Sequence, residues 1–332
     1  MLSGNIWLWI GFNLFVLAML ALDLGIFHRN AHTVSIKEAL LWSVVWITMA
    51  MVFNVGLYFF GGIEPALEFF TGYLIEKSLS VDNIFVFVLL FTSFQVPAAY
   101  QHRVLFWGVL GALIMRGIMI ALGAVLLTTF HWVIYLFGAF LIIAGLRMAF
   151  HREMEVRPEK NPLLRLVRRI IPVTSDYVED HFIVWQAGRV LITPLLLVLL
   201  AIETTDLIFA LDSIPAVFAV TQDPFIVYTS NIFAILGLRS LYFVFANAMS
   251  KFYYLKIGLA VILSFVGAKM VLSDIYHIPI ELALAVIAVV LAAVIVASVV
   301  RAQRLTAGNR EPEIKTSTDV AKEITSEREK SV

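Results

Sequence analysis

The sequence of 332 residues contains no cysteine and unusually few charged residues. Without cysteine the chain can form no disulfide, no thiolate metal site and no cysteine nucleophile. Charged residues make up 14% of the chain, whereas a soluble domain carries roughly 25%. Hydrophobic residues make up 61%, and the mean hydropathy is +0.92. The sequence therefore predicts an integral membrane protein, and its formal net charge of zero does not suggest a nucleic-acid partner.

The catalytic motifs that can be recognised in a single sequence are also missing. There is no HExxH, no GxSxG, no P-loop and no paired aspartates in the signatures of intramembrane proteases. We therefore expect a protein that is not an enzyme and that holds no permanently bound cofactor.

Apolar runs near 20 residues, the length that a helix needs to cross a bilayer, recur along the chain. They predict an all-α membrane protein with about nine transmembrane helices, at residues 6–27, 38–60, 67–93, 103–127, 131–150, 190–213, 225–246, 255–273 and 279–301. These helices form a transmembrane domain over residues 1–301. The connection 151–189 is expected to be a cytoplasmic loop, and the polar segment 302–332 a disordered cytoplasmic tail.

Lysine and arginine fall on only one of the two sets of loops that nine spans create. The loops 1–5, 61–66, 128–130, 214–224 and 274–278 contain neither residue. The intervening loops contain all the basic loop residues that precede the tail. The positive-inside rule then predicts a multi-pass inner-membrane protein, with the N-terminus outside and the C-terminus in the cytoplasm.

The cytoplasmic loop contains two recognisable segments. The basic amphipathic stretch PLLRLVRRII (162–171) fits a helix lying on the anionic lipid surface, and it fits a short helix packed on the bundle equally well. The stretch HFIVWQAGRVLIT (181–193) predicts a small β-hairpin that turns at positions 187 and 188.

Three short segments of the chain recur in the same order. SVDNIFV (80–86) resembles TTDLIFA (204–210), VLGALIMR (109–116) resembles ILGLRSLY (235–242), and AGLRMA (144–149) resembles VGAKMV (266–271). The repeats are expected at about 67–150 and 190–273. Each contains three spans, an odd number, so the second copy enters the membrane in the opposite direction. This 3+3 inverted repeat is typical of secondary transporters, whose sites lie near the bilayer midplane.

Acidic side chains lie inside the predicted spans, where each ionised group costs about 2.5–3.5 kcal/mol on insertion scales. One interpretation pairs them with Lys77, Arg116 and Arg239. In the other, the surplus acids form an oxygen-rich cation site suited to Mn²⁺, Mg²⁺ or Ca²⁺. Carboxylates that lie close together bind protons more readily, so some of them would be protonated without the metal and would release protons when it binds. The candidate metal ligands are Glu76, Asp82, Asn83, Glu203, Asp206 and Asp212.

Further residues are candidates for the transport path. Ser80, Thr205 and Ser213 would supply neutral oxygens, and Asp23 would lie at the cytoplasmic opening. Arg116 and Arg239 would pair with acids when the site is empty. Pro215 is expected to break its helix and thereby re-aim the carboxylate of Asp212.

Two blocks of the sequence closely resemble the TerC family of bacterial membrane proteins, in particular its Alx-like branch. They are FFTGYLIEKSLSVDNIFVF (69–87) and ETTDLIFALDSIPAVFAVTQDPFIVYTSNIFAILGLRSLYF (203–243). The resemblance covers about residues 5–300. It implies a place among LysE-type transporters, a link to tellurium resistance, and export of Mn²⁺. Carried over residue by residue, it singles out Glu76, Asp82 and Asn83 in the first block and Glu203, Asp206 and Asp212 in the second.

The sequence and the resemblance together predict a secondary transporter that exports a divalent cation, with Mn²⁺ the first candidate and protons as counter-ions. Export, as opposed to import, follows from the resemblance alone. The alternative is a non-transporting membrane scaffold of a metal- or tellurite-stress complex, in which the acids are structural. Membrane lipids are the other expected partners, and no protein partner can be named.

Overall fold

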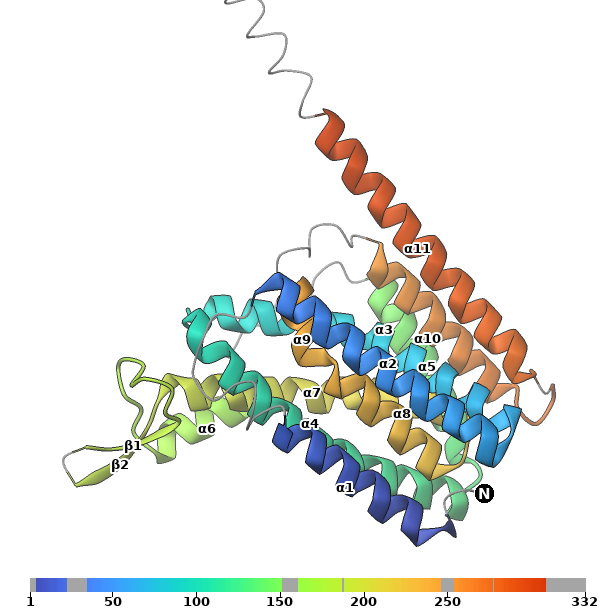
Figure 1. Ribbon diagram of the computed structural model, residues 1–332, viewed down its shortest axis with the longest axis horizontal. Coiled ribbons are helices and arrows are strands. Elements are labelled where there is room, and N and C mark those ends of the chain that lie inside the picture. The colour runs from blue at the N-terminus through green and yellow to red at the C-terminus, as the bar shows by residue number, and fades with distance from the viewer. Residues whose placement is uncertain are drawn as a thin grey trace, which may run out of the picture.

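The computed structural model describes residues 4–22, 35–150, 161–186, 188–245, 254–276 and 278–308. Nearly all of these residues are helical and run side by side in one bundle (Figure 1). The helices are α1 (Ile6–Leu22), α2 (Ile36–Gly61), α3 (Ile63–Ser93), α4 (Ala98–Thr129), α5 (Val133–Phe150), α6 (Pro162–Ile170), α7 (Pro194–Phe218), α8 (Pro224–Leu236), α9 (Leu238–Phe245), α10 (Leu255–Val271) and α11 (Ile280–Gly308).

Each predicted apolar run coincides with helix in the described part of the chain. There, six helical segments are long and apolar enough to cross a membrane: α2, α4, α5, α7, the α8–α9 segment and α11. Helix α1 is apolar but shorter. These helices confirm an all-α membrane protein, because a helix satisfies its own backbone hydrogen bonds in lipid. The total of nine spans stays a prediction.

The structure corrects two sequence-based expectations about α7. Its first predicted residues belong instead to strand β2 (Arg189–Ile192), and the helix begins at Pro194. The expected break at Pro215 is absent, since α7 continues to Phe218. Pro215 lies in the last turn, where its missing N–H removes a single hydrogen bond close to the helix end. Its carbonyl still accepts from Ala219.

The expected disordered tail was placed too early in the chain. Helix α11 passes residue 301 and ends at Gly308 (Figure 1). The segment RAQRL that follows the apolar run consists of good helix formers, so it extends the helix although it is polar. Residues 309–332 lie outside the described residues.

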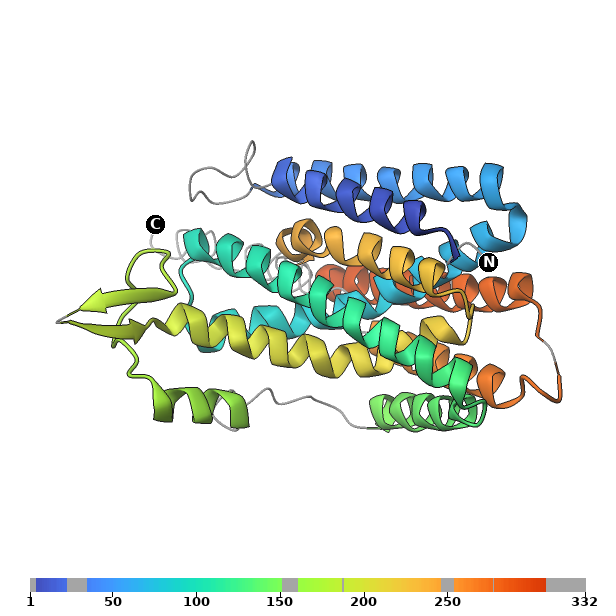
Figure 2. The same ribbon diagram turned by 90° about the horizontal axis from the view of Figure 1, so that it is seen from below.

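The predicted β-hairpin is confirmed. Strand β1 (Ile183–Gln186) pairs antiparallel with β2, and Gly188 adopts the positive φ of 74° that the tight turn requires. Helix α6 and the hairpin lie at one end of the bundle, where the hairpin projects beyond the helices (Figure 2). Leu164 of α6 is only 2% exposed, which confirms that this helix packs on the bundle.

Helices α5 and α10 approach each other most closely through glycines. A Cβ atom added to Gly267 would lie 2.7 Å from the carbonyl oxygen of Gly138, and one added to Gly145 would lie 2.7 Å from the carbonyl oxygen of Ala260. Backbone thus meets backbone at this interface, as is common where small residues join membrane helices.

We predict that Gly267→Ala lowers the apparent thermal unfolding midpoint of the detergent-purified protein. Overpacking of this kind costs about 1–3 kcal/mol, and the rigid backbone opposite leaves the new methyl group no space. The matched control is Gly56→Ala, because nothing lies within 4 Å of a Cβ atom at Gly56. Equal midpoints for the two variants would contradict this description of the interface.

Candidate functional site

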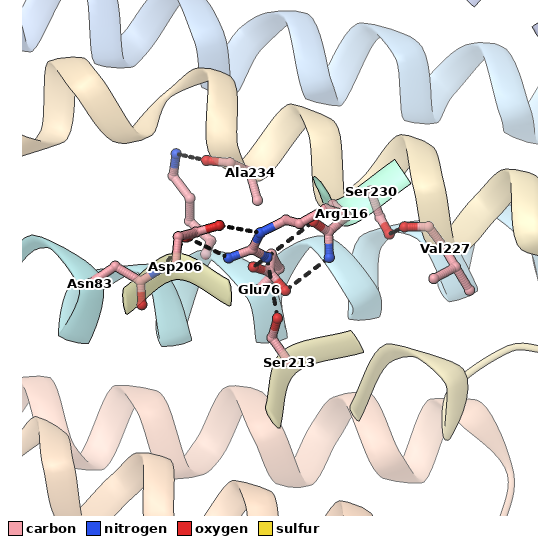
Figure 3. A network of polar contacts seen from close by, with 10 residues as sticks. Glu76, Asn83, Arg116, Asp206, Ser213, Val227, Ser230 and Ala234 are labelled. Atoms are coloured by element: carbon pink, nitrogen blue, oxygen red, sulfur yellow. Dashed lines mark hydrogen bonds and ion pairs between the residues drawn. The ribbon is translucent and has the colours of Figure 1, made fainter. Parts of the chain in front are cut away.

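Arg116 of α4 lies at the centre of the candidate site and is completely buried. Its guanidinium group is bonded to Asp206 of α7 in a bidentate manner, from Nε to Oδ2 at 3.1 Å and from Nη2 to Oδ1 at 3.1 Å. On the other side, Nη1 donates to Glu76 of α3. Figure 3 shows the two carboxylates pointing at this one cation. Charge-assisted, bidentate pairs of this kind are strong and directional.

Asn231 of α8 joins the same network through both ends of its side-chain amide. Its Nδ2 donates to Glu76 at 3.0 Å, and its Oδ1 accepts from Arg116 Nη1 at 3.1 Å. The sequence analysis missed this residue. The available signal was a buried amide within the apolar run 225–246, where an unsatisfied polar group would be costly.

Ser213 and Asn83 complete the network. The Ser213 hydroxyl accepts from Arg116 Nη1 at 3.2 Å, and Asn83 Nδ2 donates to Asp206 Oδ1 at 3.3 Å. The groups of this network come from α3, α4, α7 and α8, so these four helices meet at one point (Figure 3). The network holds two carboxylates for one guanidinium group.

Asp82 and Asp212 lie beside this network. A cavity of about 10 Å³, roughly the room that one water molecule needs, adjoins both of them. Its polar lining consists of Glu76, Asp82, Asn83, Arg116, Asp212 and Ser213. A second cavity of about 10 Å³ adjoins Asp206 and is otherwise apolar. Asp82 of α3 and Asp212 of α7 thus share one small polar space.

Glu203 points elsewhere. Its carboxylate lies against Gly111 of α4, in space that a side chain at that position would occupy. Its Oε2 is buried and has no hydrogen-bond partner within the described residues, as is also true of the Ser80 hydroxyl. Thr205 donates to the carbonyl of Ala201 in its own helix at 2.8 Å. These three candidates are therefore not joined to Arg116.

The remaining candidate cations have other neighbours. Arg239 Nη1 lies 3.1 Å from the ring Nε2 of His102. Lys77 Nζ donates to the carbonyl of Ala234 at 3.2 Å and fills the space beneath Gly237, where α8 ends and α9 begins. Asp23, the candidate for the cytoplasmic opening, lies outside the described residues.

The acids are not gathered around one empty metal position. Among the residues that the structure describes, no group of three or more histidine, aspartate or glutamate side chains is arranged to hold a metal ion. Arg116 instead occupies the centre, with acids on several sides of it. The positive charge of Arg116 is thus balanced by the carboxylates of Glu76 and Asp206.

We predict that Arg116→Met strongly destabilises the protein, because it leaves two buried carboxylates facing each other. Removing one partner of a buried ion pair costs about 3–5 kcal/mol. Adding Glu76→Gln and Asp206→Asn to the same chain should restore most of the loss. The unfolding midpoint of the detergent-purified protein, followed by intrinsic tryptophan fluorescence, measures both effects.

The control is Arg189→Met, which removes an exposed arginine and should leave the midpoint unchanged. A triple variant that unfolds as readily as Arg116→Met would show that the lost charge balance is not the cause.

Comparison with known proteins places this site in a family. The family profile described as "Integral membrane protein TerC family" matches residues 61–306, which include every residue of the Arg116 network. The chain is 57% identical over 300 residues to an uncharacterised membrane protein of Myxococcus xanthus, covering 90% of this chain and 94% of that one. It is 49% identical over 293 residues to a protein of Escherichia coli K12 that is provisionally named membrane-bound redox modulator Alx, covering 86% and 91%.

A more distant relative is an uncharacterised membrane protein of Rickettsia felis, 40% identical over 295 residues that cover 88% of this chain and 97% of that one. No solved structure matches the chain. The family profile spans most of the chain, and the relatives align over nearly their whole length. The chain therefore belongs to the TerC family of integral membrane proteins, in its Alx-like branch.

Proposed function

We propose that this protein is a secondary transporter that exports a divalent cation, with Mn²⁺ the first candidate, in exchange for protons. The observation that carries the proposal is the fully buried Arg116, which holds Glu76 and Asp206 together between α3, α4 and α7. The guanidinium group stands where a transported cation would be balanced by the same acids.

The atoms around the guanidinium group are suitable ligands for a hard cation. Arg116 donates to carboxylate oxygens of Glu76 and Asp206, to the amide oxygen of Asn231 and to the hydroxyl oxygen of Ser213. Carboxylate, carbonyl and hydroxyl oxygens are the donors that Mn²⁺, Mg²⁺ and Ca²⁺ prefer. If Arg116 withdraws, the same oxygens are left to receive the metal ion.

This proposal makes Arg116 a competitor of the substrate. Metal binding displaces the guanidinium group. The adjoining cavity, which Arg116 also lines, would offer it the carboxylates of Asp82 and Asp212. When the metal leaves, protons or Arg116 neutralise the acids again. Since a buried carboxylate without a counter-charge is costly, each metal ion that departs favours the uptake of a positive charge.

The predicted inverted repeat is part of the proposal. Helix α3 packs on α7 and α8, while its counterpart α7 packs on α3 and α4. Helix α5 packs mainly on its counterpart α10. Such reciprocal contacts support a pseudo-two-fold relation between α3–α5 and α7–α10, which would allow the site to open to either side in turn. We also propose that the protein lies in the inner membrane, with its N-terminus outside and its C-terminus in the cytoplasm.

Several relatives are named for a redox role. This chain contains no cysteine, so a redox role shared with them has to work without a thiol of its own. Transport of a metal ion meets that condition, since it requires only the oxygen and nitrogen groups described above.

The transport proposal predicts that purified protein in proteoliposomes moves Mn²⁺ down its gradient and moves protons the opposite way. Asp206→Asn should abolish both fluxes, because it removes a carboxylate that binds the cation. A trapped Mn²⁺-quenched dye and a trapped pH dye report the two movements. Asp176→Asn, which changes an exposed loop aspartate, is the matched control.

Equal Mn²⁺ movement by wild type, Asp206→Asn and protein-free vesicles would contradict transport and favour the scaffold alternative. Mn²⁺ movement without a pH change would retain transport and contradict proton exchange. Repeating the assay with Mg²⁺ and Ca²⁺ identifies the substrate.

A second prediction concerns Glu203. In Gly111→Ala the new methyl group displaces the flexible Glu203 carboxylate, so the fold should survive while Mn²⁺ flux falls, by up to about 100-fold if the carboxylate takes part in transport. Gly108→Ala is the matched control, because its methyl group would meet a methyl group of Ile202 at 3.2 Å instead. Equal fluxes in both variants would exclude Glu203 from the path.

A further inference from the structure

We propose that α6 is a binding site for anionic phospholipid at the membrane surface. The helix has only nine residues, yet its side chains form three distinct stripes along its axis. Leu164, Val167 and Ile171 pack on the hydrophobic cluster at the end of α3, α4 and α7. This first stripe fixes the helix to the bundle.

The second stripe is apolar but uncovered. Leu163, Leu166 and Ile170 are 38%, 53% and 68% exposed. They follow each other at i, i+3 and i+7 and therefore lie on one side of the helix. With the packed stripe they form a continuous apolar surface about 160° wide, of which the bundle covers only one part.

The third stripe is basic. Arg165, Arg168 and Arg169 occupy the remaining side of the helix and are all exposed. Within the part of the chain that the structure describes, none of their guanidinium groups makes a hydrogen bond or ion pair with another residue. The helix itself contains no acidic residue. Long arginine side chains can reach lipid phosphates while the neighbouring leucines lie among acyl chains.

The segment that follows α6 is held beside the ends of two long helices of the bundle, α3 and α4. The Tyr177 hydroxyl, just after α6, donates to the carbonyl of Phe94 at the end of α3, at 2.7 Å. Asp180 pairs with Arg103 near the start of α4. Of these two helices, α4 is long and apolar enough to cross a membrane, and Figures 1 and 2 show α6 at the same end of the bundle. Lipid headgroups are expected at the level where such a helix ends.

These observations together favour lipid over a protein partner as the occupant. An amphipathic helix at the membrane border, with uncovered leucine and isoleucine beside unpaired arginines, matches the apolar and anionic parts of one phospholipid. Three arginines near an anionic surface favour binding by about 100-fold in all at low salt. The helix therefore adds an anionic-lipid requirement to the protein, whatever the bundle transports.

The absence of cysteine permits a direct test on the full chain. Leu166→Cys supplies the only thiol, to which an environment-sensitive fluorophore is attached before reconstitution into nanodiscs. The nanodiscs contain phosphatidylcholine alone or with phosphatidylglycerol, together with doxyl-labelled lipid as quencher. We expect a blue-shifted emission and strong quenching with phosphatidylglycerol, and weaker effects without it.

Two further chains serve as controls. A fluorophore at Ser175→Cys, in the exposed loop after α6, should stay in water in both lipid mixtures. In the Leu166→Cys background, Arg165→Gln, Arg168→Gln and Arg169→Gln together should reduce quenching to the phosphatidylcholine level. All of these positions are exposed, so gel filtration should show an unchanged, monodisperse protein.

Each outcome decides the proposal. A Leu166 fluorophore that remains in water in both mixtures overturns it, and so does quenching that is equal with and without phosphatidylglycerol. Quenching that depends on phosphatidylglycerol but survives loss of the three arginines also overturns it, because another surface would then recognise the lipid. The site is supported if replacing the three arginines abolishes the quenching and the fluorophore at position 175 stays unquenched in both mixtures.

Discussion

The whole central structure depends on one buried positive charge. Arg116 is 0% exposed and is bonded to groups from three other helices, α3, α7 and α8. In a low-dielectric interior such a charge fixes the relative positions of its partners, because moving any of them leaves an unpaired group. The packing around the network is therefore as much a consequence of this charge as of the hydrophobic clusters that surround it.

The same charge explains why two of the acids, Glu76 and Asp206, are tolerated in the interior of the bundle. Glu76 and Asp206 share Arg116, whereas Asp82 and Asp212 lie by a small polar cavity and Glu203 lies by a glycine. The protein thus provides one strong ionic contact and several weaker polar environments.

Much of the architecture could be predicted from sequence, because apolar length and spacing decide where membrane helices form. The helices near each predicted run, the hairpin at Gly188 and the pairing chemistry of Arg116 all follow from local patterns. The end of α7 did not, because the effect of Pro215 depends on how close it lies to the helix terminus. The place of Glu203 against Gly111 and the role of Asn231 depend on contacts between distant helices, which no periodicity contains.

Glu76 and Lys77 are consecutive residues of α3, and each is attached to a different neighbour. Glu76 is bonded to Arg116, while Lys77 donates to Ala234 where α8 gives way to α9. Consecutive side chains leave a helix about 100° apart, so one rigid turn connects the two contacts. Rotation of α3 that detaches Glu76 also pulls the ammonium group from the junction of α8 and α9. The loss of a central ionic bond is thereby coupled to the junction at which α8 ends and α9 begins.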